Sequence, residues 1–121
     1  MAIASAFRIL PVSGPLGGEI ELPGSKSITN RALLLAALAE GTSRLTGALK
    51  SDDTLYMAAA LRLMGVDVAE PTATSFVVTG RGRFAVPPGP LFLGNAGTAV
   101  RVLSAVAPYW PGDVGLAGDD H

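Results

Sequence analysis

The chain contains no cysteine and a single histidine, His121 at its end. The lack of cysteine excludes disulfide bonds and thiolate metal ligands, and one histidine leaves no cluster of zinc-binding side chains. We therefore expect no metal and no cofactor. A chain without cysteine also fits the reducing conditions of the cytoplasm.

Charged residues are scarce as well, at 16% of the chain against about 25% in a typical soluble domain. The net charge is −1 and the basic residues are scattered, which excludes the electrostatic footprint of a nucleic-acid-binding protein. No apolar run approaches the roughly 20 residues that cross a bilayer, and residues 1–10 lack the apolar core of a secretory signal. We expect a soluble, cytoplasmic protein with no nucleic-acid or membrane partner. So little charge beside 49% apolar residues predicts that part of the surface faces other protein.

Two short segments with a leading glycine are the most informative feature that is present. They span residues 24–31 (GSKSITNR) and 94–101 (GNAGTAVR), and each runs into a stretch rich in Ala, Leu and Val. A polar turn followed by a helix is typical of an anion site. The first backbone N–H groups of the helix are unpaired, its N-terminus is partly positive, and glycine lets a ligand approach the backbone. The pattern predicts a surface that binds phosphate or carboxylate groups.

Hydrophobic periodicity predicts an α/β fold in which a first strand at residues 7–12 precedes the order β-α-β-α-β-β, followed by β-α-β. The predicted strands cover residues 7–12, 19–22, 42–46, 66–69, 75–79, 91–93 and 113–116, with a turn at 71–72; the helices cover 26–39, 51–64 and 97–107. The helix at 26–39 is apolar nearly all round, so we expect it to be interior. Aligning Gly24 with Gly94 places Arg31 on Arg101, which indicates an internal repeat.

In the first segment, Lys26 falls in the first turn of a predicted helix, where the helix dipole disfavours a cation by roughly 0.3–1 kcal/mol. Ser27 and Arg31 are four residues apart, so the hydroxyl and the guanidinium lie on one face and can share an anionic ligand. The alternative is that Lys26 and Arg31 are solvated and that Ser27 only caps the helix.

In the second segment, Asn95 can cap a helix and Gly97 can let a ligand touch the backbone. Thr98 and Arg101 are three residues apart on one face. The alternative is an Asn-capped helix with an exposed arginine.

Two acidic residues follow a serine at the start of the middle helix. Ser51, Asp52 and Asp53 have the pattern of a capped helix start, in which acids favour the partly positive N-terminus. The alternative role for Asp52 and Asp53 is to orient the cationic site.

The two glycine-led segments, extended to residues 22–39 and 91–101, closely resemble the two signature segments of the EPSP (5-enolpyruvylshikimate-3-phosphate) synthase family. Residues 51–53 and 64–66 also match that family. The resemblance implies transfer of the enolpyruvyl group of phosphoenolpyruvate to the 5-hydroxyl of shikimate 3-phosphate, a step of the shikimate pathway to the aromatic amino acids. It also implies a fold of two lobes built from repeated βαβαββ units as an inside-out α/β barrel, with the active site between the lobes.

Residue roles follow from the resemblance position by position. It implies that Lys26 is catalytic and bridges the two substrates, and that Ser27 and Arg31 hold shikimate 3-phosphate. The residues that it places on or behind the phosphoenolpyruvate side are Asn95, Gly97, Thr98 and Arg101. Val102 stands where many members have proline, behind the pocket that the herbicide glyphosate also occupies.

Members of the family are more than three times as long as this chain. The resemblance therefore implies that residues 1–17 carry a strand of the second lobe and that residues 18–121 form the first part of the N-terminal lobe. Unit 1 would cover about 18–80, and an incomplete unit 2 about 91–121. We expect the chain to be inactive without the C-terminal remainder of the enzyme.

Two other interpretations stay open. A UDP-N-acetylglucosamine enolpyruvyltransferase shares the fold, but its first signature is of the Ser-Gly-Ala-Lys-Asn type and it usually uses a catalytic cysteine. The second alternative is a stand-alone phosphate-binding or interaction module without turnover.

Overall fold

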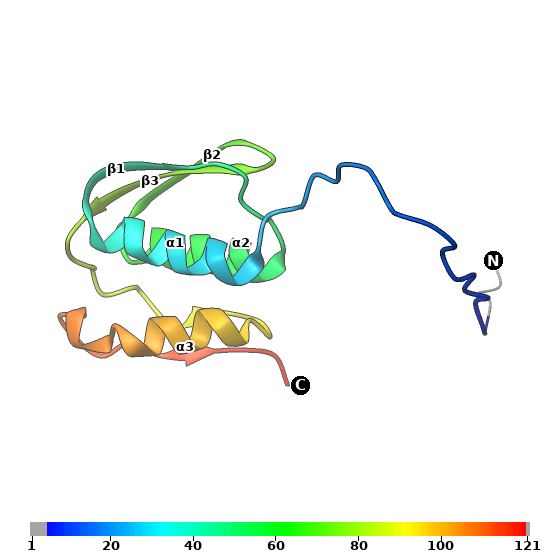
Figure 1. The fold of residues 1–121 in the computed structure, drawn as a ribbon. Coiled ribbons are helices and arrows are strands. Elements are labelled where there is room, and N and C mark those ends of the chain that lie inside the picture. The colour runs from blue at the N-terminus through cyan, green and yellow to red at the C-terminus, as the bar shows by residue number, and fades with distance from the viewer. Residues whose placement is uncertain (1–4, 121) are drawn as a thin grey trace.

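The structure is a computed structural model that describes residues 5–120, and its elements confirm the mixed α/β class (Figure 1). In chain order the elements are α1 (Lys26–Leu38), β1 (Glu40–Leu45), α2 (Asp52–Leu63), β2 (Asp67–Thr72), β3 (Ser75–Arg81), β4 (Leu91–Phe92), α3 (Gly97–Ala105), the 3-10 helix η1 (Ala107–Tyr109) and β5 (Leu116–Ala117). Within residues 5–120, no helix is long and apolar enough to cross a membrane.

The elements form three layers (Figure 1). The first is an antiparallel sheet in the order β1-β3-β2, with Thr42 opposite Thr79 and Val68 opposite Val78. α1 and α2 cover one face of this sheet. α3 packs against both helices, and the short parallel pair of β4 and β5 accompanies it.

The core lies between the sheet and the helices. Phe76 of β3 and Leu33, Met57 and Leu61 of the helices are fully buried in one cluster. Each such side chain stabilises the fold by roughly 1.5–3 kcal/mol relative to an exposed one. The C-terminal end of α1 rests directly on β3, because a Cβ at Gly80 would overlap the backbone carbonyl oxygens of residues 36, 37 and 39.

The strands predicted at 7–12 and 19–22 are absent, so that part of the prediction is wrong for this structure. Residues 5–25 form an extended arm that leaves the layered body (Figure 1). The side chains of Phe7 and Ile20 are 82% and 84% exposed. Alternating sequence alone does not form a strand, because a strand needs the backbone of a neighbour to pair with.

The other differences are smaller. β2 continues through Pro71 and Thr72, so the turn falls at residues 73–74. α3 ends at Ala105, two residues earlier than predicted, and the last strand is Leu116–Ala117 instead of 113–116. α1 is not interior all round, because Ile28 and Leu35 are each 66% exposed. These two side chains are seven residues apart and share one side of the helix.

Candidate functional site

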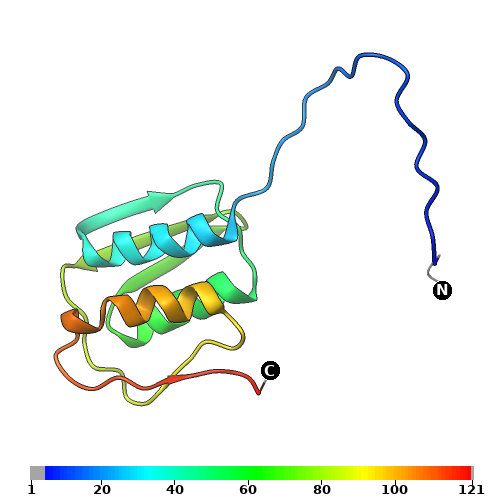
Figure 2. The same cartoon turned by 60° about the horizontal axis from the view of Figure 1, so that its bottom comes forward.

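The three α-helices all begin at the same end of the molecule (Figures 1 and 2). The extended arm enters at this end, and the last described residues return to it, where the Asp119 N–H donates to the Gly94 carbonyl at 3.2 Å. Each helix start carries unpaired N–H groups and a partial positive charge. Three such starts make this end of the molecule favourable for anions.

The start of α1 is fixed by side-chain hydrogen bonds. Ser25 caps the helix, since its Oγ accepts from the Ile28 N–H at 3.3 Å. Thr29 Oγ1 donates to the Ser25 carbonyl at 2.7 Å and accepts from the Leu49 N–H at 3.1 Å, which ties α1 to the segment before α2. The alternative that Ser27 caps the helix is therefore wrong. Ser27 is half-buried one turn before the exposed Arg31, so helical spacing puts both on one face.

Lys26 is paired across the helix starts. Its Nζ lies 2.9 Å from Asp53 Oδ2 in the first turn of α2, with side chains 48% and 21% exposed. The ion pair offsets the unfavourable position of Lys26 at a helix N-terminus, and an exposed pair of this kind is worth about 0.2–1 kcal/mol. Asp52 is exposed and makes no ion pair within residues 5–120. Asp53, and not Asp52, thus has the geometry to orient the lysine.

The start of α3 differs from its prediction. Its N-cap is Ala96 with no side-chain cap, so the prediction that Asn95 caps this helix is wrong. The Ala96 N–H donates to the Leu93 carbonyl at 3.0 Å in a tight turn, and the side chain of Asn95 is exposed. Thr98 is half-buried and Arg101 is exposed one turn further along the helix.

The glycines of the two segments have different surroundings. A Cβ at Gly97 would meet nothing within 4 Å and the residue is exposed, so there is space for a ligand beside it, although its N–H donates to the Asn95 carbonyl at 3.1 Å. A Cβ at Gly24 would lie 2.6 Å from the Leu49 nitrogen and 2.7 Å from the Ala48 carbonyl carbon. Gly24 thus packs against another stretch of backbone on the side where a Cβ would project.

Asn30 is a residue that the sequence analysis did not single out. It is fully buried on α1 beside Arg31, and neither its Oδ1 nor its Nδ2 has a hydrogen-bond partner among the described residues. Leaving a buried polar group unpaired costs about 1–3 kcal/mol. An asparagine inside a helical apolar run gave no signal of this burial.

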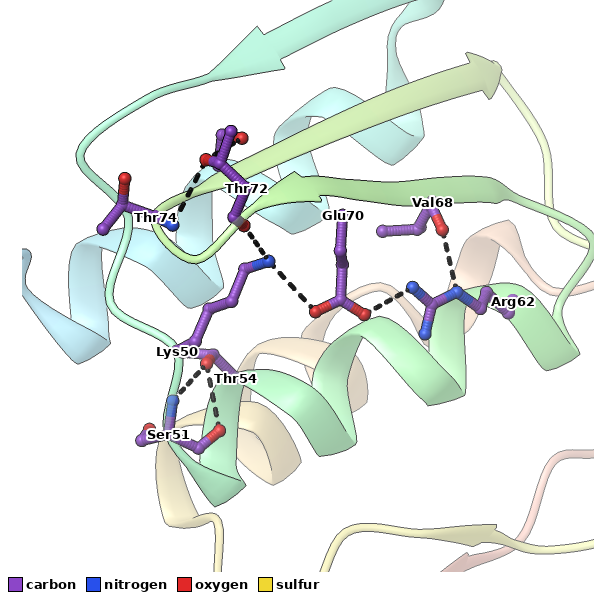
Figure 3. Close-up of polar contacts among 9 residues, drawn as sticks. Lys50, Ser51, Thr54, Arg62, Val68, Glu70, Thr72 and Thr74 are labelled. Carbon is purple, nitrogen blue, oxygen red and sulfur yellow. Dashed lines mark hydrogen bonds and ion pairs between the residues drawn. The ribbon is translucent and has the colours of Figure 1, made fainter.

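A second group of charges was also missed, and it joins β2 to both ends of α2 (Figure 3). Glu70 accepts from Arg62 at 2.8 Å and lies 3.2 Å from the Nζ of Lys50, which also donates to the Thr72 carbonyl at 2.6 Å. The hydrogen bond from Arg62, followed by the Lys50 ammonium, lowers the pKa of Glu70 from its ordinary value of 4.5 although partial burial opposes this. Both cations are already paired with the Glu70 carboxylate, so the group serves as a structural clamp.

Two hollows lie near the start of α1. One of about 420 Å³ lies between α1 and β1 and includes Thr29 and Arg44; another of about 360 Å³ includes Pro23 and Thr74. Neither hollow is lined by Lys26 or Arg31. These two hollows therefore lie apart from the two cations of the first segment.

Comparison with known proteins identifies what the chain is similar to. The family model described as EPSP synthase (3-phosphoshikimate 1-carboxyvinyltransferase) matches residues 11–121. A protein named 3-phosphoshikimate 1-carboxyvinyltransferase from Rhizobium leguminosarum bv. trifolii (strain WSM2304) is 62% identical over 121 residues, which is 100% of this chain and 29% of that protein. One of the same name from Pseudomonas savastanoi pv. phaseolicola (strain 1448A / Race 6) is 61% identical over 117 residues, 97% of this chain and 28% of that protein. The solved EPSP synthase from Acinetobacter baumannii superposes with a TM-score of 0.79 at 34% identity, over 85% of this chain and 24% of its own.

The fold is thus that of part of a two-lobed enolpyruvyl transferase. The chain belongs to the EPSP synthase family. It spans about 29% of the length of the curated relatives that it matches.

Proposed function

We propose that this chain forms part of an enzyme that transfers the enolpyruvyl group of phosphoenolpyruvate to the 5-hydroxyl of shikimate 3-phosphate and releases phosphate. The observation that carries the proposal is the gathering of three helix starts at one end of the molecule, beside Lys26 and Arg31. The relatives named for this activity are up to 62% identical across the chain. Since the chain spans 29% of their length, the C-terminal remainder of the enzyme is its proposed partner and closes the cleft. The combination of the two is called the completed enzyme below.

The electrostatics of the helix starts suit these substrates. The two substrates together bring about six negative charges, which fixed cations and helix N-termini stabilise without reorganising. Ser27 and Arg31, on one face of α1, are proposed to hold shikimate 3-phosphate through charge-assisted hydrogen bonds. Lys26 lies between this face and α2 and is proposed to bridge the substrates and to stabilise charge or move a proton during addition and elimination.

The start of α3 is proposed to bind phosphoenolpyruvate. The open backbone at Gly97 supports direct contact with the ligand, and the exposed side chain of Asn95 is adjacent. Thr98 and Arg101 are proposed to support this turn from the first turns of the helix. Asp53 is proposed to orient the Lys26 ammonium, a role supported by their 2.9 Å contact.

The domain assignment is also part of the proposal. Residues 18–80 would form unit 1, residues 91–121 the beginning of unit 2, and residues 1–17 a strand of the second lobe. The exposed apolar side chains of Phe7 and Ile9 support a role for this arm in pairing with other protein. A cytoplasmic location is proposed as well, supported by the complete lack of cysteine.

The test supplies the missing portion of the enzyme from the Rhizobium leguminosarum relative, namely the part beyond the matched 29%. This portion is either mixed with the purified chain or co-expressed with it. Phosphate release is measured with both substrates. We expect no turnover from the chain alone and turnover from the completed enzyme. If both pieces are soluble and the combination is inactive, the stand-alone binding module becomes the better interpretation.

Two substitutions test the residue assignments in the completed enzyme. Lys26→Ala and Arg31→Ala should each lower kcat/KM by about a hundredfold or more, since each removes a fixed charge from a site that the closed cleft shields from water. The matched control is Arg81→Ala. Arg81 is an exposed arginine at the end of β3, paired in the sheet with Glu40, and so lies near the C-terminal end of α1 and away from the helix starts. Near-normal kcat/KM in either test variant would contradict its assigned role.

A further inference from the structure

The first two turns of α2 contact both signature segments. Asp53 pairs with Lys26 of the first segment at 2.9 Å. Three residues later, the ring of Tyr56 packs against Gly94 of the second segment, where a Cβ would lie 2.5 Å from Cε2 and 3.0 Å from Cζ. Residues three apart share one face of a helix, so one face at the start of α2 reaches both segments.

Gly94 is held from several directions. Its φ of +54° is a left-handed conformation that favours glycine. The Tyr56 ring on one side is itself held edge-on by Phe92, with centroids 5.4 Å apart and planes at 79°. The Gly94 carbonyl accepts from the Asp119 N–H at 3.2 Å. The turn at residues 94–97 is thus seated against the Tyr56 ring and the returning chain.

The base of this arrangement is itself fixed. The Ser51 N–H donates to Thr54 Oγ1 at 2.9 Å, which stabilises the start of α2 just before Tyr56. Met57, the next residue, is fully buried in the core. Tyr56 therefore projects from a well-anchored helical turn and can serve as a rigid support.

We propose that Tyr56 is a positioning residue, which sets the turn at 94–97 relative to Lys26 and so sets the affinity for the enol phosphate substrate. This inference rests on the proposed function of the same site. Tyr56 acts through Gly94 and touches no substrate. Its aromatic ring carries the effect, because the ring atoms make the contacts with Gly94 and Phe92.

The kinetic test uses three variants of the completed enzyme. Tyr56→Leu should raise KM for phosphoenolpyruvate by about tenfold or more, because displacement of a binding turn by even about 1 Å is costly. The affinity for shikimate 3-phosphate should stay within about twofold, since Asp53 still holds Lys26. Tyr56→Phe keeps the ring and should behave as wild type. Tyr109→Leu, at an exposed tyrosine on η1, is the matched control and should change neither constant.

An NMR measurement tests the same contact without relying on turnover. In the wild-type completed enzyme, the α-protons of Gly94 should show a ring-current shift from Tyr56. The shift should persist in Tyr56→Phe and disappear in Tyr56→Leu.

Three outcomes would overturn the inference: an unchanged KM for phosphoenolpyruvate in Tyr56→Leu, an equal loss of affinity for both substrates, or a Tyr56→Phe variant as defective as Tyr56→Leu. If the wild-type enzyme binds neither substrate, the proposed function fails by itself. The ring-current shift of the Gly94 α-protons then still tests the contact between Tyr56 and the turn. If that shift is unchanged in Tyr56→Leu, the positioning role of Tyr56 is overturned independently of the proposed function.

Discussion

Replacing Gly24 by alanine should destabilise the protein strongly, although Gly24 lies in a polar turn at the surface of the signature segment. Its φ is not positive, so the backbone conformation itself accommodates alanine. The added Cβ would instead lie 2.6 Å from the Leu49 nitrogen, 2.7 Å from the Ala48 carbonyl carbon and closer still to the Gly47 carbonyl oxygen. All three atoms belong to backbone, which cannot rotate away as a side chain can.

The magnitude follows from these contacts. Ordinary van der Waals contact begins near 3.4 Å, so relieving the Leu49 contact alone would separate the start of α1 from residues 47–49 by roughly 0.8 Å, and the closer Gly47 oxygen requires more. This movement would stretch the 3.1 Å hydrogen bond from the Leu49 N–H to Thr29 Oγ1. Overpacking of this kind costs about 1–3 kcal/mol, and loss of one hydrogen bond adds about 1 kcal/mol. We expect a loss of about 2–4 kcal/mol in the free energy of unfolding.

Urea unfolding followed by circular dichroism measures this loss, with Gly89→Ala as the matched control. A Cβ at Gly89 would meet nothing within 4 Å and its φ is not positive, so alanine there should be neutral or slightly stabilising. If Gly24→Ala unfolds within about 0.5 kcal/mol of Gly89→Ala, the packing role of Gly24 is refuted. A variant that kept full stability and lost only substrate affinity would instead favour the original interpretation, in which Gly24 opens the backbone to a ligand.

Two further predictions concern groups outside the substrate site. Glu70→Gln should destabilise the protein by about 1 kcal/mol at pH 7, because it removes the charge held by Lys50 and Arg62. Since the pKa of Glu70 is lowered on folding, this stabilisation is present above 4.5 and is lost as pH falls through the folded-state pKa. The difference between the two proteins in urea unfolding should therefore vanish in acid, and a difference independent of pH would contradict the ion-pair account. Asn30→Leu should leave the free energy of unfolding unchanged or raise it by up to about 2 kcal/mol, because both amide atoms are buried without partners among the described residues. Thermal unfolding measures this, and a fall of more than about 1 kcal/mol would show that the amide is hydrogen-bonded.

Local signals were sufficient to predict much of the body. α1 and α2 lie where the apolar spacing and, for α2, Ser51 placed them, and Gly65 follows α2 with a φ of +85°. Capping and helical periodicity act within a few residues, so the sequence carries them directly. The strand predicted at 75–79 is also present, as β3, whose residues mostly alternate between buried and half-buried.

Two of the failures involve partners distant in sequence, and a third depends on which local hydrogen bond forms. Alternation in residues 19–22 predicted a strand, but strand formation depends on a neighbour that pattern alone does not supply. Asn95 has the side chain of a cap, yet the bond from Ala96 to Leu93 starts α3 one residue later. The contact between Tyr56 and Gly94 spans 38 residues, and only tertiary packing brings them together.

The central claim is that the shared end of the three helices, with Lys26 and Arg31, binds the two phosphorylated substrates. Isothermal titration of shikimate 3-phosphate into the completed enzyme tests it most directly, with the Lys26→Ala/Arg31→Ala double variant beside it and Arg81→Ala as the control. The account predicts saturable, one-to-one binding to the wild type and to Arg81→Ala, and binding weaker by about a hundredfold or more in the double variant. Equal affinity in the wild type and the double variant would contradict it.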